Sequence, residues 1–340
     1  MPASSRRSRP AFTERQLAFI REYLVDLNAA EAARRAGYSP DGANRIAHVL
    51  RCKPKIAARI ETAQERRSEK KRITADRVLE ELDYRREARN QHLMAAYYDG
   101  HPTICVPQVI GALSTRRVLT SELSSGARFA ELAGWPQEER NLAAETIYRF
   151  VFRSLYEVRA FNGDPHSGNY LFHGGGRVTF LDFGLVKHFT LAELQPLMQM
   201  NRRLCVEHDP EAFRRSLESA GVLRPHAPLS TDAIIEHLAV FYDTIREPGP
   251  LAITSDYASS VVRRFFDLRS PVAEYISVPK SYVILQRINL GLFAVLGQLS
   301  ATANWRAISE EIWPFTQAPA STPMGEAEAA WRARRHPIAA

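Results

Sequence analysis

The chain has 340 residues, 45% of them hydrophobic and 24% charged, with a formal net charge of +7. This length accommodates one large domain or two smaller ones, with enough apolar surface for a substantial core. The most apolar run, residues 290–297, is far shorter than the ~20 residues of a membrane-spanning helix, and the chain does not start with the apolar core of a signal peptide. The three cysteines are scattered without metal-ligand spacing. We therefore expect a soluble, cytoplasmic protein without a transmembrane segment.

Positive charge is concentrated at one end of the chain. Residues 1–72 contain 17 Lys and Arg against 8 Asp and Glu, whereas the remaining residues contain 28 against 30. Clustered Lys and Arg give sequence-independent affinity for phosphate backbones, so this segment is a candidate polyanion-binding module that follows a basic, disordered arm at residues 1–11. The alternative is a solvated helical face.

Helical patterns dominate residues 12–72. Thr13 and Gln16 form a capping box before the first apolar repeat, and Gly37 suits the left-handed position after a second, Ala-rich helix. A third helix is expected from about residue 40 to residue 51. Its inward residues are predicted to be Ile46, Val49 and Leu50, and its outward residues Asn44, Arg45 and His48. Short helices around a Gly-containing turn predict a helix-turn-helix arrangement.

The segment from Phe12 through TERQLAFIREYLVDLNAAEAARRAGYS to about ITADRVLEEL resembles the N-terminal domain of phage terminase small subunits. The resemblance implies DNA binding through the outward face of the third helix, at Asn44, Arg45 and His48. The alternative is that these helices only pack against a partner.

A second motif lies in the centre of the chain. In the loop at residues 162–169, Asp164 and Asn169 stand five residues apart, and the triplet Asp182-Phe183-Gly184 follows thirteen residues after Asn169. Phosphoryl transfer needs a carboxylate to position the attacking hydroxyl, and an Asn and an Asp to hold the magnesium ions. We therefore predict Asp164 as the catalytic residue and Asn169 and Asp182 as metal ligands.

Strand patterns around this motif support the same interpretation. A β-hairpin is expected between residues 170–172 and 178–181, and it would bring Asn169 and Asp182 to one metal. An earlier hairpin is expected from residues 105–113 and 117–123. His166 is predicted to have only a supporting role in holding the loop.

Residues 81–313 resemble the UbiB/AarF family of atypical kinases. The matching segments are Glu81-Leu82-Asp83, Glu87-Ala88-Arg89-Asn90, STRRVLTSEL at residues 114–123, and the loop at residues 162–169. The resemblance implies an Mg-ATP cofactor, with Glu87 pairing with a nucleotide-binding lysine and Glu122, Leu123 and Ser124 facing the adenine. The loop departs from the family pattern at Asn162, where many members have His, and at Ser167, where most have Pro.

The nucleotide-gripping half of a kinase fold is not recognisable. No lysine lies between Lys71 and Lys187, and residues 1–87 contain only Gly37 and Gly42 as glycines. A phosphate-covering loop and a strand lysine supply much of the electrostatic stabilisation in phosphoryl transfer, so we expect weak or absent transfer. Without the first strands, the hairpin at residues 105–123 would have an open edge. The N-terminal helices, a second copy of the chain or a partner would then cover it.

The predicted fold class is α+β, mostly helical: a truncated kinase-like fold, with a hairpin remnant of the N-lobe and a helical C-lobe, after a helix-turn-helix-like module. The expected boundaries are an arm at residues 1–11, the module at 12–72, the kinase-like domain at 73–315 and a disordered tail at 316–340. Three functions remain open: an impaired atypical kinase, a DNA-binding terminase-like protein with a passenger domain, and a fusion whose kinase-like half is a scaffold.

Overall fold

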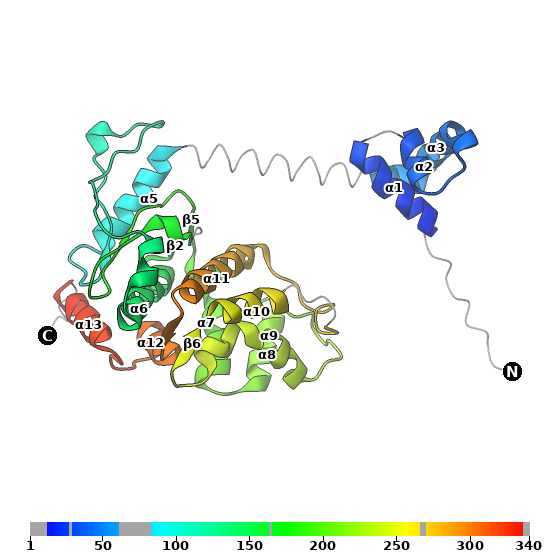
Figure 1. Ribbon diagram of the computed structural model, residues 1–340. Helices are drawn as coiled ribbons and strands as arrows, with labels where there is room; N and C mark the ends of the chain where they lie inside the picture. The colour runs from blue at the N-terminus through cyan, green and yellow to red at the C-terminus, as the bar shows by residue number, and fades with distance from the viewer. Residues whose placement is uncertain (1–11, 27–28, 61–82, 163–164, 266–269, 336–340) are drawn as a thin grey trace. The chain divides into compact units, whose positions relative to one another are not determined.

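The computed structural model describes residues 12–26, 29–60, 83–162, 165–265 and 270–335 (Figure 1). The chain divides into two compact units, residues 1–80 and 81–340. Each unit is described separately.

The first unit is a small helical module. Its elements are α1 (Glu14–Asp26), α2 (Ala29–Arg35), a 3-10 turn (Pro40–Gly42) and α3 (Ala43–Cys52), and residues 54–60 are also helical. The predicted capping box is confirmed, because the Thr13 N–H donates to Gln16 Oε1 at 3.0 Å. Gly37 has φ +82° after α2, as expected for a residue that ends a helix in the left-handed region.

The third helix differs from its prediction at one position. Its buried residues are Ala43, Ala47 and Leu50, spaced four and three residues apart, so they share one face. Val49 lies two residues after Ala47 and therefore points about 200° away around the helix. It is 51% exposed, so the prediction that it faces inward is wrong.

The second unit is mostly helical with few short strands, in agreement with the predicted fold class. Its helices are α5 (Tyr84–Tyr97), α6 (Gln137–Arg153), α7 (Leu191–Asn201), α8 (Pro210–Ser219), α9 (Thr231–Arg246), α10 (Ser255–Phe265), α11 (Lys280–Gln298), α12 (Trp305–Ile312) and α13 (Pro323–Arg335). Its strands are β1 (Ile104–Cys105), β2 (Ala160–Asn162), β3 (Tyr170–Phe172), β4 (Val178–Phe180), β5 (Val186–His188), β6 (Leu251–Ile253) and β7 (Ala301–Ala303). A π-helical turn, Ser154–Val158, extends α6.

The strands form three small sheets. β3 and β4 are the predicted antiparallel hairpin, with Tyr170 opposite Phe180 and Phe172 opposite Val178. β1 pairs in parallel with the other side of β4, while β2 pairs with β5 and β6 with β7. The β3–β4 hairpin and the pairing of β2 with β5 bring the loop before β3 close to the turn after β4.

The other predicted hairpin, at residues 105–123, forms only in part. The two arms meet through one bridge, Val109 to Ser121, and through backbone hydrogen bonds from the Ile110 N–H to the Thr120 carbonyl at 2.8 Å and from the Glu122 N–H to the Gln108 carbonyl at 2.9 Å. Regular strands do not form there, because Pro107 lacks an N–H and a 3-10 turn begins at Gly111. The exposed apolar side chains in this segment are Ile110, Leu113, Val118 and Leu123. The idea that a partner covers them stays a prediction.

Two apolar cores fill the second unit. The first surrounds the hairpin and includes Phe150 stacked on Phe180, with ring centroids 3.7 Å apart. The second lies among α7, α8 and α9. Partly buried residues that pack against both cores are Tyr156, Leu197, Phe241 and Tyr282. The two cores therefore meet along a seam.

The expected disordered tail at residues 316–340 is wrong for its central part. α13 is a 13-residue helix, and it packs through Met324, Glu328 and Trp331, which are buried. The Ala, Pro and Arg-rich composition suggested disorder, but these residues recur at helical spacing and form one face. Residues 336–340 lie outside the described part of the chain.

No helix among the described residues is long and apolar enough to cross a membrane. The expectation of a cytoplasmic location stays a prediction.

Candidate functional site

The β3–β4 hairpin brings the predicted metal ligands together. The Leu181 N–H donates to the Asn169 carbonyl at 3.0 Å, so Asn169 lies beside the residue that precedes Asp182. The Asn162 side-chain amide donates to the Asp182 carbonyl at 2.5 Å. Asn162, a departure from the family pattern, therefore fastens the loop to the Asp182 turn.

The turn at Asp182 is fixed from both sides. Asp182 Oδ1 accepts the Gly184 N–H at 2.9 Å, and Phe183 is fully buried in the first core. The Asn90 amide of α5 donates to the Phe183 carbonyl at 3.0 Å, and Asn90 Oδ1 lies 3.0 Å from His188 Nε2. α5 is therefore joined directly to the turn.

Glu87 of α5 lies against the same turn. A Cβ placed on Gly184 would be 3.4 Å from Glu87 Oε2 and 3.4 Å from Asp182 Oδ1. Partial burial raises the pKa of the Glu87 carboxyl, the negative charge of Asp182 raises it further, and the Phe183 N–H acts in the opposite direction. Two carboxylates thus share one side of the turn, where a bound cation would relieve their repulsion.

The predicted pairing of Glu87 with a lysine is not seen among the described residues. Its carboxylate instead lies near Asp182 and accepts the Phe183 N–H. Lys187 is engaged elsewhere, since its Nζ lies 3.3 Å from Glu193 Oε1 and 5.1 Å from the Phe189 ring centre. Sequence reasoning missed the approach of Glu87 to Asp182, because it depends on how α5 packs against a segment far along the chain.

The donor set fits magnesium. Carboxylate and amide oxygens are the hard ligands that Mg²⁺ prefers, and Mg²⁺ sites commonly use one or two carboxylates plus phosphate oxygens. Asp182, Asn169 and nearby Glu87 supply these groups. No group of three or more His, Cys, Asp or Glu side chains that could hold a metal ion occurs in the described part of the chain, so an all-protein cage is not formed there. Asp164, the predicted catalytic residue, lies outside the described residues.

The loop between Asp164 and Asn169 is held at two points. His166 Nδ1 accepts the Gly168 N–H at 3.0 Å, which agrees with its predicted supporting role. Pro165 packs on α11 at Gly291, where an added Cβ would lie 2.3 Å from Pro165 Cγ. Glycine at position 291 is therefore what allows this close approach. Sequence analysis did not identify Gly291, which lies far from the motif in sequence.

The predicted adenine-facing residues lie in the irregular segment after β1. Glu122 Oε2 accepts the Gln108 N–H at 3.0 Å, so this side chain braces its own loop. Leu123 is fully exposed, and Ser124 is half-buried. Their contact with a nucleotide base stays a prediction.

Comparisons with known proteins identify the family of the chain. The model of the ABC1 atypical kinase-like domain matches residues 47–216, half of the chain. The chain belongs to this family. Within the family's match lie α5, the β3–β4 hairpin, the loop at residues 162–169 and the Asp182 turn.

Two relatives illustrate the similarity. An aarF domain-containing protein kinase of the chloroplast from Arabidopsis thaliana is 27% identical over 236 residues, which cover 68% of this chain and 33% of that protein. The mitochondrial atypical kinase COQ8B from Rattus norvegicus is 36% identical over 110 residues, covering 32% of this chain and 21% of that protein. The chain thus spans about a third or less of the length of these relatives.

A solved structure shows the same fold. The complex of Rv3197 with erythromycin from Mycobacterium tuberculosis has a TM-score of 0.58 and 26% identity, covering 84% of this chain and 69% of that chain. The terminase resemblance of the N-terminal segment receives no support from these comparisons. The match to the ABC1 domain begins at residue 47 and therefore includes the later part of that segment.

On the first unit, the predicted DNA-contacting residues are placed as expected on α3. Asn44, Arg45 and His48 are all exposed. His48 Nε2 lies 3.7 Å from Cys52 Sγ, one helical turn away. Exposure makes these residues available to a partner and does not by itself identify one.

Proposed function

We propose that the second unit binds a magnesium–nucleotide complex through Asn169 and Asp182 and that its phosphoryl transfer is weak or lost. The observation that carries the proposal is the hydrogen bond from the Leu181 N–H to the Asn169 carbonyl, which brings Asn169 beside the residue that precedes Asp182 at the base of one hairpin. The approach of Glu87 to Asp182 adds negative charge where a cation would bind. Family membership supports the same chemistry.

In this proposal, the side-chain oxygens of Asn169 and Asp182 hold the cation, and Asn162 and Asn90 fix the backbone that presents Asp182. The cation would supply charge neutralisation at the nucleotide phosphates. Asp164 would orient the acceptor hydroxyl, as its spacing from Asn169 predicts. Transfer is impaired because no lysine lies between Lys71 and Lys187 to engage the phosphates.

The decisive experiment is a calorimetric titration of the full chain with Mg-ATP, repeated with Asp182→Asn. We expect binding by the unaltered chain and at least a tenfold loss in the variant, since a ligand carboxylate is removed. Asp232→Asn is the matched control, because Asp232 is an exposed residue in the first turn of α9. Unchanged affinity in Asp182→Asn would refute the assignment.

A second measurement addresses the predicted impairment. Single-turnover loss of the γ-phosphate is followed with radiolabelled ATP and magnesium. Protein kinases typically turn over at roughly 1–100 per second, and we expect a rate far below this range. A rate within it would show that another group replaces the missing lysine.

We propose, as a second function, that the first unit binds DNA. The supporting observations are the excess of 17 Lys and Arg over 8 Asp and Glu in residues 1–72 and the exposure of Asn44, Arg45 and His48 on α3. The test is an anisotropy titration of duplex DNA at several salt concentrations, with the full chain and with a chain lacking residues 1–72. Binding that survives the deletion would exclude this unit as the site.

A further inference from the structure

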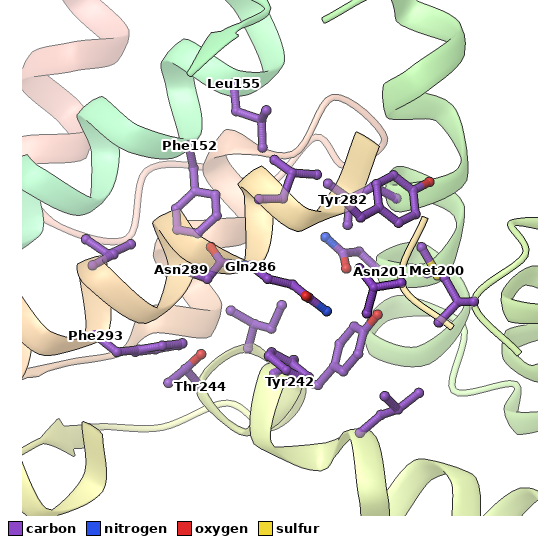
Figure 2. Close-up of a pocket in the computed structure, with 18 of the residues that line it drawn as sticks. Phe152, Leu155, Met200, Asn201, Tyr242, Thr244, Tyr282, Gln286, Asn289 and Phe293 are labelled. Atoms are coloured by element: carbon purple, nitrogen blue, oxygen red, sulfur yellow. The ribbon is translucent and has the colours of Figure 1, made fainter. Parts of the chain in front are cut away.

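A cavity of about 290 Å³ lies in the helical part of the second unit (Figure 2). Side chains from α6, α7, α9 and α11 line it. Its walls include Tyr156, Leu197, Phe241 and Tyr282, the residues that pack against both cores. The cavity therefore occupies the seam between the cores.

Its size is unusual for a folded interior. Protein cores are close-packed and contain few voids larger than a water molecule. An apolar cavity of ~150 Å³ is already large enough to bind benzene. Concave, mostly apolar spaces with a few convergent polar groups are the typical form of small-molecule sites.

The lining is mainly aromatic and aliphatic. Figure 2 shows Phe152, Met200, Tyr242, Tyr282 and Phe293 around the same space. Flat rings on several sides favour a flat or hydrocarbon-rich occupant, because aromatic groups pack well in offset or edge-to-face contacts.

Polar groups converge on this apolar space from two helices. Gln286 and Asn289 project from α11 and Tyr242 from α9 (Figure 2). Among the described residues, the side-chain polar atoms of Gln286, Asn289 and Tyr242 have no hydrogen-bond partner. They are also not among the fully buried atoms that lack a partner, so they are accessible to a small molecule. Asn201 differs, since its amide donates to the Tyr156 hydroxyl at 3.2 Å. The cavity thus offers amide and hydroxyl groups that are ready to meet one ligand oxygen.

The few charged residues of the lining argue against an anionic ligand. Arg264 is the lone Lys, Arg, Asp or Glu among the described residues of the lining. Its side chain is 62% exposed and lies 3.6 Å from Asp243, so it marks the mouth and already has an acidic partner. An anion in the interior would therefore be buried without compensation, at a high free-energy cost.

We propose that this cavity binds a neutral, largely aromatic or hydrocarbon small molecule that carries one hydroxyl or carbonyl oxygen. The rings of Phe152, Tyr282 and Phe293 contact its apolar body, and the Gln286 amide hydrogen-bonds its oxygen. Glu87, Asn169 and Asp182 are not part of this lining, and the inference does not depend on nucleotide binding.

The test compares three probes of one shape: naphthalene, 2-naphthol and 2-naphthoate. Binding to the full chain is measured by calorimetry at neutral pH. We expect 2-naphthol to bind most tightly and 2-naphthoate to bind at least tenfold more weakly, because its charge cannot be compensated. Equal or tighter binding of 2-naphthoate, or no binding of any probe, would overturn the proposal.

Two variants locate the site. Gln286→Leu keeps the side-chain size but removes the amide, so 2-naphthol should lose about five- to tenfold in affinity while naphthalene loses none. Arg287→Leu on the same helix is the control, since Arg287 is exposed and is not part of the lining.

Ala273→Trp fills the cavity and should abolish binding of all probes, with folding checked by circular dichroism. Unchanged 2-naphthol binding in Gln286→Leu would place the probe elsewhere and refute the assignment.

Discussion

Glu328 of α13 is buried between two arginines of α6. Its Oε2 lies 2.9 Å from Arg149 Nη1 and 3.1 Å from Arg153 Nη2, and its side chain is 2% exposed. Burial alone would raise the pKa of the Glu328 carboxyl, but His101 and the two guanidinium groups lower it more, so the net pKa is well below the usual range. Glu328 therefore stays ionised and compensates two buried positive charges.

Replacing Glu328 with Gln should strongly destabilise the second unit. The change removes the one carboxylate that pairs with both Arg149 and Arg153. Arg149 keeps Glu145 and Glu311, and Arg153 keeps Glu157, so we expect a loss near the lower end of the about 3–5 kcal/mol that breaking a buried ion pair costs. Chemical denaturation measures the free energy of unfolding. Glu326→Gln is the matched control, because Glu326 is exposed on the same helix. A loss similar to that of the control would contradict this account of the cluster.

His101 belongs to the same cluster and should make stability depend on pH. Its Nδ1 accepts the Thr103 N–H at 3.2 Å and the Ile104 N–H at 2.9 Å, so protonation of Nδ1 would break both bonds. Burial lowers the pKa of His101 from 6.5, although nearby Glu328 raises it in part and Arg149 and Arg153 lower it. The unfolded chain then binds the proton at higher pH than the folded chain, so stability falls as pH drops below about 6.5.

The variant His101→Asn should flatten this dependence. Its amide oxygen can accept a backbone N–H but does not titrate. We expect the slope of unfolding free energy against pH, measured between pH 5 and 7, to be smaller than in the unaltered chain. His92→Gln, at an exposed position of α5, should leave the slope as it is. An identical slope in His101→Asn would show that this histidine does not carry the effect.

Helix α11 connects the loop at residues 162–169 with the interior cavity. Gly291 contacts Pro165, while Leu292 and Phe293 line the cavity. Gly291→Ala places a Cβ 2.3 Å from Pro165 Cγ, so the loop or the helix must shift, at a cost of about 1–3 kcal/mol. We expect weaker Mg-ATP binding by calorimetry together with this loss of stability. Gly134→Ala is the control, since an added Cβ there meets nothing within 4 Å.

At the level of elements, sequence patterns predict the structure correctly where residues close together in the chain determine it. The hairpin of residues 170–172 and 178–180 and the capping box at Thr13 follow from turn chemistry and capping residues, and both are confirmed. Residues 105–123 alternate like strands, but their pairing depends on partners distant in sequence, and β1 joins β4 instead. α13 was missed because its folding depends on buried arginines of α6, nearly 180 residues earlier.

At the level of the whole molecule, the two units each have their own apolar core. The first is built around Phe19, Ala33 and Leu50, and the second around the hairpin and α9. We therefore predict that a chain of residues 81–340 folds by itself and binds Mg-ATP with the affinity of the full chain. Calorimetric unfolding of the full chain should then show two transitions, of which the shorter chain keeps one. A single transition, or a shorter chain that loses nucleotide binding, would contradict this prediction.

The arrangement of the candidate site could be predicted only in part. The five-residue spacing within the loop and the hairpin indicated that Asn169 and Asp182 come together, and the chain does place them so. The approach of Glu87 to Asp182 could not be predicted, because it depends on how α5 packs against a segment far along the chain. The cavity also left no motif, since its lining comes from many separate helices and loops and its residues resemble ordinary core.

Helix α5 is held at the end farthest from the Asp182 turn. The Trp331 indole of α13 donates to the Asp99 carbonyl at 2.8 Å, and its ring packs against Tyr97 and Tyr98. Glu87 lies about ten residues before this anchor, or roughly 15 Å along the helix. α13 therefore fixes one end of α5, and the position of Glu87 depends on the angle of the helix at this anchor. A tilt of α5 by only a few degrees about this anchor would displace Glu87 by roughly 1 Å. A displacement of that size is enough to change whether a side chain can contact a bound cation.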